Sequence, residues 1–149
     1  MIAAYASTLF GIGRFPAAPG TIASLVALPI AWLVMSLGGP VPLLVLAFVT
    51  AALGIWACDV YARATGTLDP SECVIDELAG QFIACAFAPL SLPAFALAFV
   101  LFRLFDISKL WPISAAERLR GGLGIMADDL VAGLFAGLIV AVFVSVGLL

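Results

Sequence analysis

The sequence predicts an all-α, polytopic integral membrane protein, a helical bundle of about five membrane helices with one short interfacial helix. Two observations predict this fold class. The chain of 149 residues is 65% hydrophobic and only 10% charged, whereas a soluble domain carries roughly 25% charged residues. Its six basic and nine acidic residues all lie between Arg14 and Asp129, in clusters that long uncharged stretches separate and follow. The length predicts a single domain over residues 1–149.

Each predicted helix is an apolar segment, because a membrane span needs about 20 residues and about 17 suffice. The segments are Ile22–Leu37, Val41–Ala57, Val74–Leu90, Ala94–Phe105 and Leu130–Leu148. We expect the third helix to begin near Pro70, because Asp69-Pro70-Ser71-Glu72 has the pattern of a capped helix start. Ser114-Ala115-Ala116-Glu117 has a similar pattern and predicts the short interfacial helix, which Gly121 ends.

The topology depends on the breaker sequence Pro89–Pro93. If it forms a hairpin, all charged residues lie on one face of the membrane and the C-terminus lies on the other. If Val74–Phe105 is instead one kinked span, Arg103 to Arg120 lie on the face opposite the other charges. An excess of Lys and Arg marks the cytoplasmic side, which favours the hairpin. Met1–Gly13 lacks a basic n-region and is interpreted as retained chain, not as a signal peptide.

Two acidic pairs, Asp76-Glu77 and Asp128-Asp129, border apolar segments. Acidic residues in such segments are costly and usually functional. With a helix start near Pro70, the first pair lies about two turns inside its helix, where neighbouring side chains can border one cleft between helices. The simpler alternatives are headgroup-level carboxylates in water for the first pair, and an N-cap with a dipole-favoured acid for the second.

A second group of charges, Arg103, Asp106 and Lys109, recurs every three residues and shares one helix face. It is either a self-neutralising ladder at the membrane boundary or an acidic metal ligand flanked by two phosphate-binding cations. The Gly- and Pro-rich loop from Gly11 to Thr21 leads into the first span, and Thr21, as the expected N-cap, and the free amides of that helix end could receive an anion.

The remaining charges have simpler interpretations. Asp59 and Arg63 are four residues apart and predict a helical ion pair. Arg118 and Arg120 are expected to face anionic lipid headgroups.

Several enzyme classes are excluded by what the chain lacks. It has no histidine, so neither a phosphohistidine intermediate nor a Ser–His triad is available. Neither Cys58 nor Cys73 has an arginine six residues later, as a cysteine-phosphatase loop requires, and no Asp-x-Asp-x-Thr nucleophile motif is present. The remaining carboxylates, cations and hydroxyls fit Mg²⁺-assisted chemistry on phosphate.

These motifs resemble the phosphatidylglycerophosphatase A family of bacterial membrane enzymes. The resemblance is collinear and covers nearly the whole chain. Its pieces are Gly11-x-Gly13 through Pro19-Gly20-Thr21 with Ser24-Leu25, then Asp69-Pro70 and Val74-Ile75-Asp76-Glu77 with Gly80, then Phe102-Arg103, Asp106, Lys109 and Trp111-Pro112-Ile113, and last Gly121-Gly122-x-Gly124-Ile125-Met126-x-Asp128-Asp129 with Ala132-Gly133. The last block, with its double Asp, is the most specific.

The resemblance implies a Mg²⁺-requiring phosphatase that removes the terminal phosphate of phosphatidylglycerophosphate, a lipid in the membrane, to give phosphatidylglycerol. It implies the bacterial cytoplasmic (inner) membrane, with the active site on the cytoplasmic face. We expect one or two Mg²⁺ ions to be held by Asp76, Glu77, Asp106, Asp128 and Asp129. Lys109 is expected to be catalytic and, with Arg103, to bind phosphate oxygens, with Thr21 and Ser24 as weaker phosphate ligands.

Two other hypotheses remain. The acidic cluster could line the path of a small cation transporter or channel, or the chain could be a structural scaffold. Against a transporter or channel, no charge lies in the middle of the first, second or last apolar segment. A structural scaffold would leave the acidic pairs unexplained. No basic run predicts a nucleic-acid partner, and a homo-oligomer is compatible with the sequence.

Overall fold

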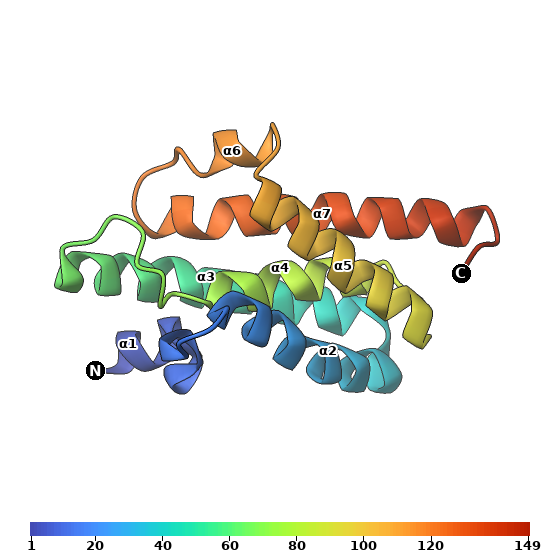
Figure 1. Ribbon diagram of the computed structural model, residues 1–149. Helices are drawn as coiled ribbons and strands as arrows, with labels where there is room; N and C mark the ends of the chain where they lie inside the picture. The colour runs from blue at the N-terminus through green and yellow to red at the C-terminus, as the bar shows by residue number, and fades with distance from the viewer.

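The computed structural model describes residues 1–149 as eight helical elements with no strand, which confirms the all-α prediction (Figure 1). In chain order these are α1 (Ile2–Ser7), η1 (Leu9–Arg14), α2 (Pro19–Gly38), α3 (Pro40–Thr65), α4 (Ile75–Ala86), α5 (Leu92–Ser108), α6 (Ile113–Ala116) and α7 (Gly122–Ser145). Only α2, α3 and α7 are both long and apolar enough to cross a membrane by themselves. With 12 residues, α4 is too short to span.

Helix α4 lies at the centre of the bundle and packs against α7, α3 and α2 (Figure 1). The main core cluster is rich in alanine and contains few large side chains, among them Phe82 of α4 and Phe102 of α5. Small residues let helix backbones approach closely, which is the usual way that membrane helices pack. The outer faces of α2, α3 and α7 expose large apolar side chains, as lipid-facing helices do.

Helices α4 and α5 form the predicted hairpin and not one kinked span. The Arg103 side chain near the end of α5 lies 4.0 Å from Glu77 at the start of α4, so the chain reverses between them (Figure 1). The reversal occurs at residues 87–91, and Ser91 caps α5 by accepting a hydrogen bond from the Ala94 amide at 3.4 Å. The breaker sequence therefore returns the chain to the end from which it came.

The predicted starts of two helices were wrong, and both errors bear on the site. Residues before Ile75 form turns, in which the Cys73 amide donates to the Pro70 carbonyl at 2.9 Å, so no helix begins near Pro70. Asp76 and Glu77 consequently lie in the first turn of α4, not two turns inside it. The opposite error occurs at α7, which begins at Gly122 and places Asp128 and Asp129 well inside the helix.

Two predicted caps are also absent. Ala18, in a left-handed conformation with φ 47°, precedes α2, so Thr21 is not its N-cap. The interfacial helix α6 has only four residues, and no side chain caps its start. In both places a proline lies at the helix start, where the sequence pattern predicted a capping hydroxyl group.

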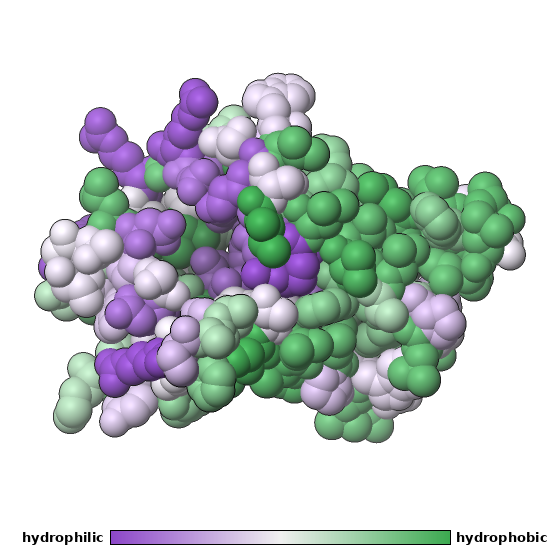
Figure 2. Space-filling model, viewed as in Figure 1, coloured by the Kyte–Doolittle hydropathy of each residue, from purple (hydrophilic) through white to green (hydrophobic).

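Polar and apolar residues separate along the long axis of the molecule. Figure 2 shows hydrophilic residues gathered at the end where Figure 1 places α1 and α6, and hydrophobic residues covering the opposite end, where the C-terminus lies. This arrangement agrees with the prediction that all the charges collect on one side of the membrane.

Candidate functional site

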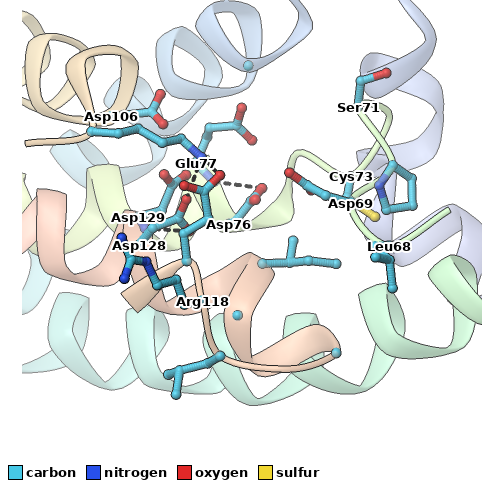
Figure 3. Close-up of a pocket in the computed structure, with 18 of the residues that line it drawn as sticks. Leu68, Asp69, Ser71, Cys73, Asp76, Glu77, Asp106, Arg118, Asp128 and Asp129 are labelled. Carbon is cyan, nitrogen blue, oxygen red and sulfur yellow. Dashed lines mark hydrogen bonds and ion pairs between the residues drawn. The ribbon is translucent and has the colours of Figure 1, made fainter. Parts of the chain in front are cut away.

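A cavity of about 750 Å³ opens at the polar end, and its wall carries both acidic pairs together with Arg103, Asp106 and Lys109 (Figure 3). The first turn of α4, the end of α5 and the N-terminal half of α7 each contribute to this wall. Three groups of residues that are far apart in the sequence are thus brought together, as the motifs predicted.

Glycines set the distance between the helices that carry the acids. A Cβ on Gly80 of α4 would lie 2.6 Å from the Asp129 carbonyl oxygen and 2.6 Å from the ring of Phe102, and a Cβ on Gly133 of α7 would overlap the Gly80 carbonyl. Only residues without a side chain fit at this crossing. The crossing lies one turn from Glu77, so it holds the acidic residues of α4 against those of α7.

Asp76, Glu77 and Asp129 form the tightest group. One carboxylate oxygen from each lies within 4.8 Å of the others, a separation from which a single ion can be bound. Two of their buried oxygens, Glu77 Oε2 and Asp129 Oδ2, have no hydrogen-bond partner, and Asp129 is only 3% exposed. Buried acceptors are normally paired, so these two oxygens fit the donor set of a cation-binding site.

The donor set fits a hard divalent cation. The clustered ligand atoms are all carboxylate oxygens, and the chain has no histidine. Oxygen-only sites suit Mg²⁺, Ca²⁺ or Mn²⁺ better than Zn²⁺. The cavity wall carries seven carboxylates and four cations, and this local excess of negative charge favours a bound cation further.

Arg103 lies between the acidic cluster and the start of α2. Its Nη1 contacts Asp106 Oδ2 and lies 4.0 Å from Glu77 Oε1, but neither contact has hydrogen-bond geometry, and Nη1 and Nε remain without an acceptor. The backbone of Gly20 closes this side, because a Cβ there would overlap Glu77 and lie 3.3 Å from Arg103 Nη1. The Nε donor, which has neither an acceptor nor an ion-pair contact, is therefore left free for an anion.

Lys109 is held by two carboxylates on other elements. Its Nζ lies 2.7 Å from Glu117 and 2.8 Å from Asp128, while its backbone ends α5 in a left-handed conformation with φ 45°. Burial lowers the pKa of Lys109, but the two ion pairs outweigh it and raise the pKa above its usual value. Lys109 thus stays charged and ties α5 and the loop of α6 to α7.

Not every predicted residue reaches the cavity. Thr21 and Ser24 are not on its wall, and the Ser24 hydroxyl donates to the Gly20 carbonyl at 2.9 Å. Their role as phosphate ligands stays a prediction without a contact to support it. The Asp59–Arg63 ion pair is confirmed at 2.6 Å.

Other residues of the wall were not expected there. Arg118 and Arg120 line it, and so does the loop from Leu68 to Ser71. The sequence placed the arginines against lipid headgroups and the loop in a helix cap. For the arginines, the signal was their position between Lys109 and the second acidic pair; for the loop, it was the Asp69-Pro70 motif.

Comparisons with known proteins give matches over most of the chain. A model of the family described as phosphatidylglycerophosphatase A matches residues 5–144. Proteins named "Phosphatidylglycerophosphatase A" are 36% identical in Escherichia coli, over 85% of this chain and 74% of that protein, and 38% identical in Haemophilus influenzae, over 88% and 82%. A Bacteroides thetaiotaomicron protein named "Putative phosphatidylinositol-3-phosphatase" is 37% identical over 91% of this chain and 89% of its own length. No solved structure matches the chain.

Proposed function

This chain belongs to the phosphatidylglycerophosphatase A family, and we propose that it hydrolyses the terminal phosphomonoester of phosphatidylglycerophosphate with the help of Mg²⁺. The products are phosphatidylglycerol and inorganic phosphate. The observation that carries the proposal is the cluster of Asp76, Glu77 and Asp129, whose carboxylate oxygens lie within 4.8 Å of one another beside a cationic guanidinium group. Such a cluster suits a dianionic phosphate only when a cation also binds.

Asp76, Glu77 and Asp129 are the residues that would hold Mg²⁺, with Asp106 and Asp128 close by on the same wall. When bound, the ion would neutralise phosphate charge and lower the pKa of a coordinated water. Mg²⁺ retains several waters and takes few carboxylates, so the whole acidic set need not contact it.

Arg103 is the residue best placed to bind the transferred phosphoryl group. Its Nε donor is buried without an acceptor at the edge of the cluster, its Nη1 lies between Asp106 and Glu77, and a guanidinium can bind two phosphate oxygens at once. In hydrolysis, a water oxygen bonds to phosphorus as the bond to the glycerol oxygen breaks. One carboxylate that does not bind the ion would take the proton of that water, and the glycerol oxygen would gain a proton as it leaves; Asp106, on the cavity wall beside the proposed phosphate ligand Arg103, is a candidate for this base.

Lys109 has a different role in this proposal from the one that its sequence position suggests. Its ammonium group already contacts Glu117 and Asp128. It therefore holds Asp128 in place and supplies positive charge to the wall, and it would reach phosphate only by leaving one of these partners. A residue that acts in this way positions the site.

We further propose that the site faces the cytoplasm from a bacterial inner membrane. The charged residues collect at one end (Figure 2), and Lys and Arg are in excess on cytoplasmic loops. The acyl chains would remain in the bilayer along the apolar helices, while the headgroup alone enters the polar cavity. A cation path through the bilayer lacks support, because a core of apolar residues lies beyond the cluster.

The test is phosphate release by the purified protein in neutral detergent, with Mg²⁺ and with excess EDTA. Phosphatidylglycerophosphate and phosphatidylinositol 3-phosphate should be compared, because the names of the relatives differ in substrate. We expect Mg²⁺-dependent release that is faster from phosphatidylglycerophosphate. No release from either lipid by folded protein would refute the proposal.

A further inference from the structure

Three of the six basic residues have no acidic partner. Arg63, Arg103 and Lys109 all take part in ion pairs, whereas no carboxylate lies within 4.0 Å of Arg14, Arg118 or Arg120. Arg14 lines a separate small depression with the N-terminal helix. Arg118 and Arg120 line the cavity that holds the acidic cluster, so two unneutralised cations lie on the wall of the proposed active site.

The turn that carries these arginines is fixed at both ends. Glu117 is held by Lys109 at 2.7 Å, and Gly121 turns the chain into α7 with φ +65°. Next to it, a Cβ on Gly122 would overlap the Ile55 carbonyl of α3. The arginines therefore belong to an anchored segment, and Figure 3 shows Arg118 among the residues that line the cavity.

The proposed substrate carries two phosphates, and the acidic cluster accounts for only one. The terminal phosphomonoester is bound by the cluster with its cation and Arg103. One glycerol unit away, the phosphodiester keeps a negative charge, which the seven carboxylates of the wall would repel. A phosphodiester in the same cavity requires cations of its own, and arginine binds phosphate oxygens in a forked geometry that lysine lacks.

We propose that Arg118 and Arg120 bind the phosphodiester of the substrate. This inference rests on the proposed function and sharpens its substrate class: a lipid in which a phosphodiester and a terminal phosphomonoester are joined by a short polyol. Lipids with a phosphomonoester alone, such as phosphatidate, lack the group that these arginines would hold. Arg118 and Arg120 are thus specificity-determining residues for the two-phosphate headgroup.

The experiment compares wild type with the Arg118→Gln/Arg120→Gln variant in neutral detergent, where no anionic bulk lipid is present. For phosphatidylglycerophosphate we expect kcat/KM to fall by about 10- to 100-fold, mainly through KM, as for the loss of charge-assisted hydrogen bonds. For phosphatidate the variant should stay within about twofold of wild type. Arg14→Gln and Arg63→Gln are matched controls that remove one surface cation elsewhere and should leave both substrates unaffected.

A second readout does not depend on phosphatidate turnover. The product phosphatidylglycerol retains the phosphodiester, so it should inhibit wild type competitively. Its inhibition of the double variant should be weaker by about tenfold or more. The inference would be overturned by equal losses of kcat/KM on both substrates or by unchanged kinetics. A defect seen only in anionic vesicles would also overturn it, because the arginines would then bind bulk lipid and not the substrate. If the wild-type protein released no phosphate at all, the proposed function itself would be refuted. This outcome differs from every result that would overturn only the inference about the arginines.

Discussion

Replacing Asp129 with asparagine should stop phosphate release and at the same time make the metal-free protein more resistant to heat. Both effects follow from the position of this side chain. It is 3% exposed, Oδ2 has no hydrogen-bond partner, and its carboxylate lies within 4.8 Å of those of Asp76 and Glu77. Without a bound cation, a negative charge at this place repels its neighbours and lacks compensation.

The magnitude follows from Coulomb's law. Two unit charges 4.8 Å apart repel by about 3.5 kcal/mol at an effective dielectric constant of 20. Because 4.8 Å is the largest separation in the cluster, closer oxygens repel more strongly, whereas partial protonation of the cluster would relieve part of the repulsion. Even a gain of about 1 kcal/mol raises the melting temperature of a chain of this size by about 2–4 °C. Activity should fall by about a hundredfold or more, because a ligand of the cation is lost.

The assay measures thermal unfolding and phosphate release on the same purified samples, in EDTA and in Mg²⁺. Wild type should gain stability from Mg²⁺ by linkage, and Asp129→Asn should gain little. The matched control is Asp59→Asn, which breaks an exposed ion pair worth at most about 1 kcal/mol and should keep activity. If Asp129→Asn turned over normally, or melted below wild type in EDTA, the assignment of Asp129 to a cation-binding cluster would be wrong.

Three further substitutions test how the site is held together. Gly20→Ala places a Cβ on Glu77, so Mg²⁺-dependent phosphate release should fall several-fold while the melting temperature changes little. Gly80→Leu forces α4 away from the backbone of α7, so it should lower both the melting temperature and the yield of folded protein. Lys109→Met leaves the buried Asp128 without its partner and should cost about 1.5–3 kcal/mol of stability, measured by thermal unfolding, whereas Lys109→Arg should restore most of that loss.

The sequence predicted the elements that depend on burial and on chain breakers. The apolar segments became helices, and Pro89–Pro93 became the turn of the α4–α5 hairpin. The collection of charges at one end followed from that hairpin. These features depend on composition over many residues, so a local error in one position does not alter them.

Helix starts were predicted less well, because tertiary contacts override local patterns. Asp69-Pro70-Ser71-Glu72 reads as a capped helix, yet that loop lines the cavity and α4 begins only at Ile75. Likewise, Asp128 looked like a cap because the apolar run begins after it, but α7 extends back to Gly122, which packs against the backbone of α3. The pairing of Lys109 with Glu117 required a fold that brings α6 next to the end of α5.

The central claim is that the cluster of Asp76, Glu77 and Asp129 binds a divalent cation that phosphate release requires. The most direct measurement is phosphate release from phosphatidylglycerophosphate by the purified wild-type protein as Mg²⁺ is titrated into a sample first stripped with EDTA. We predict no release in EDTA and a saturable return of activity with Mg²⁺, accompanied by a rise in melting temperature over the same concentrations. Full activity in excess EDTA, from protein shown to be free of metal, would contradict the claim.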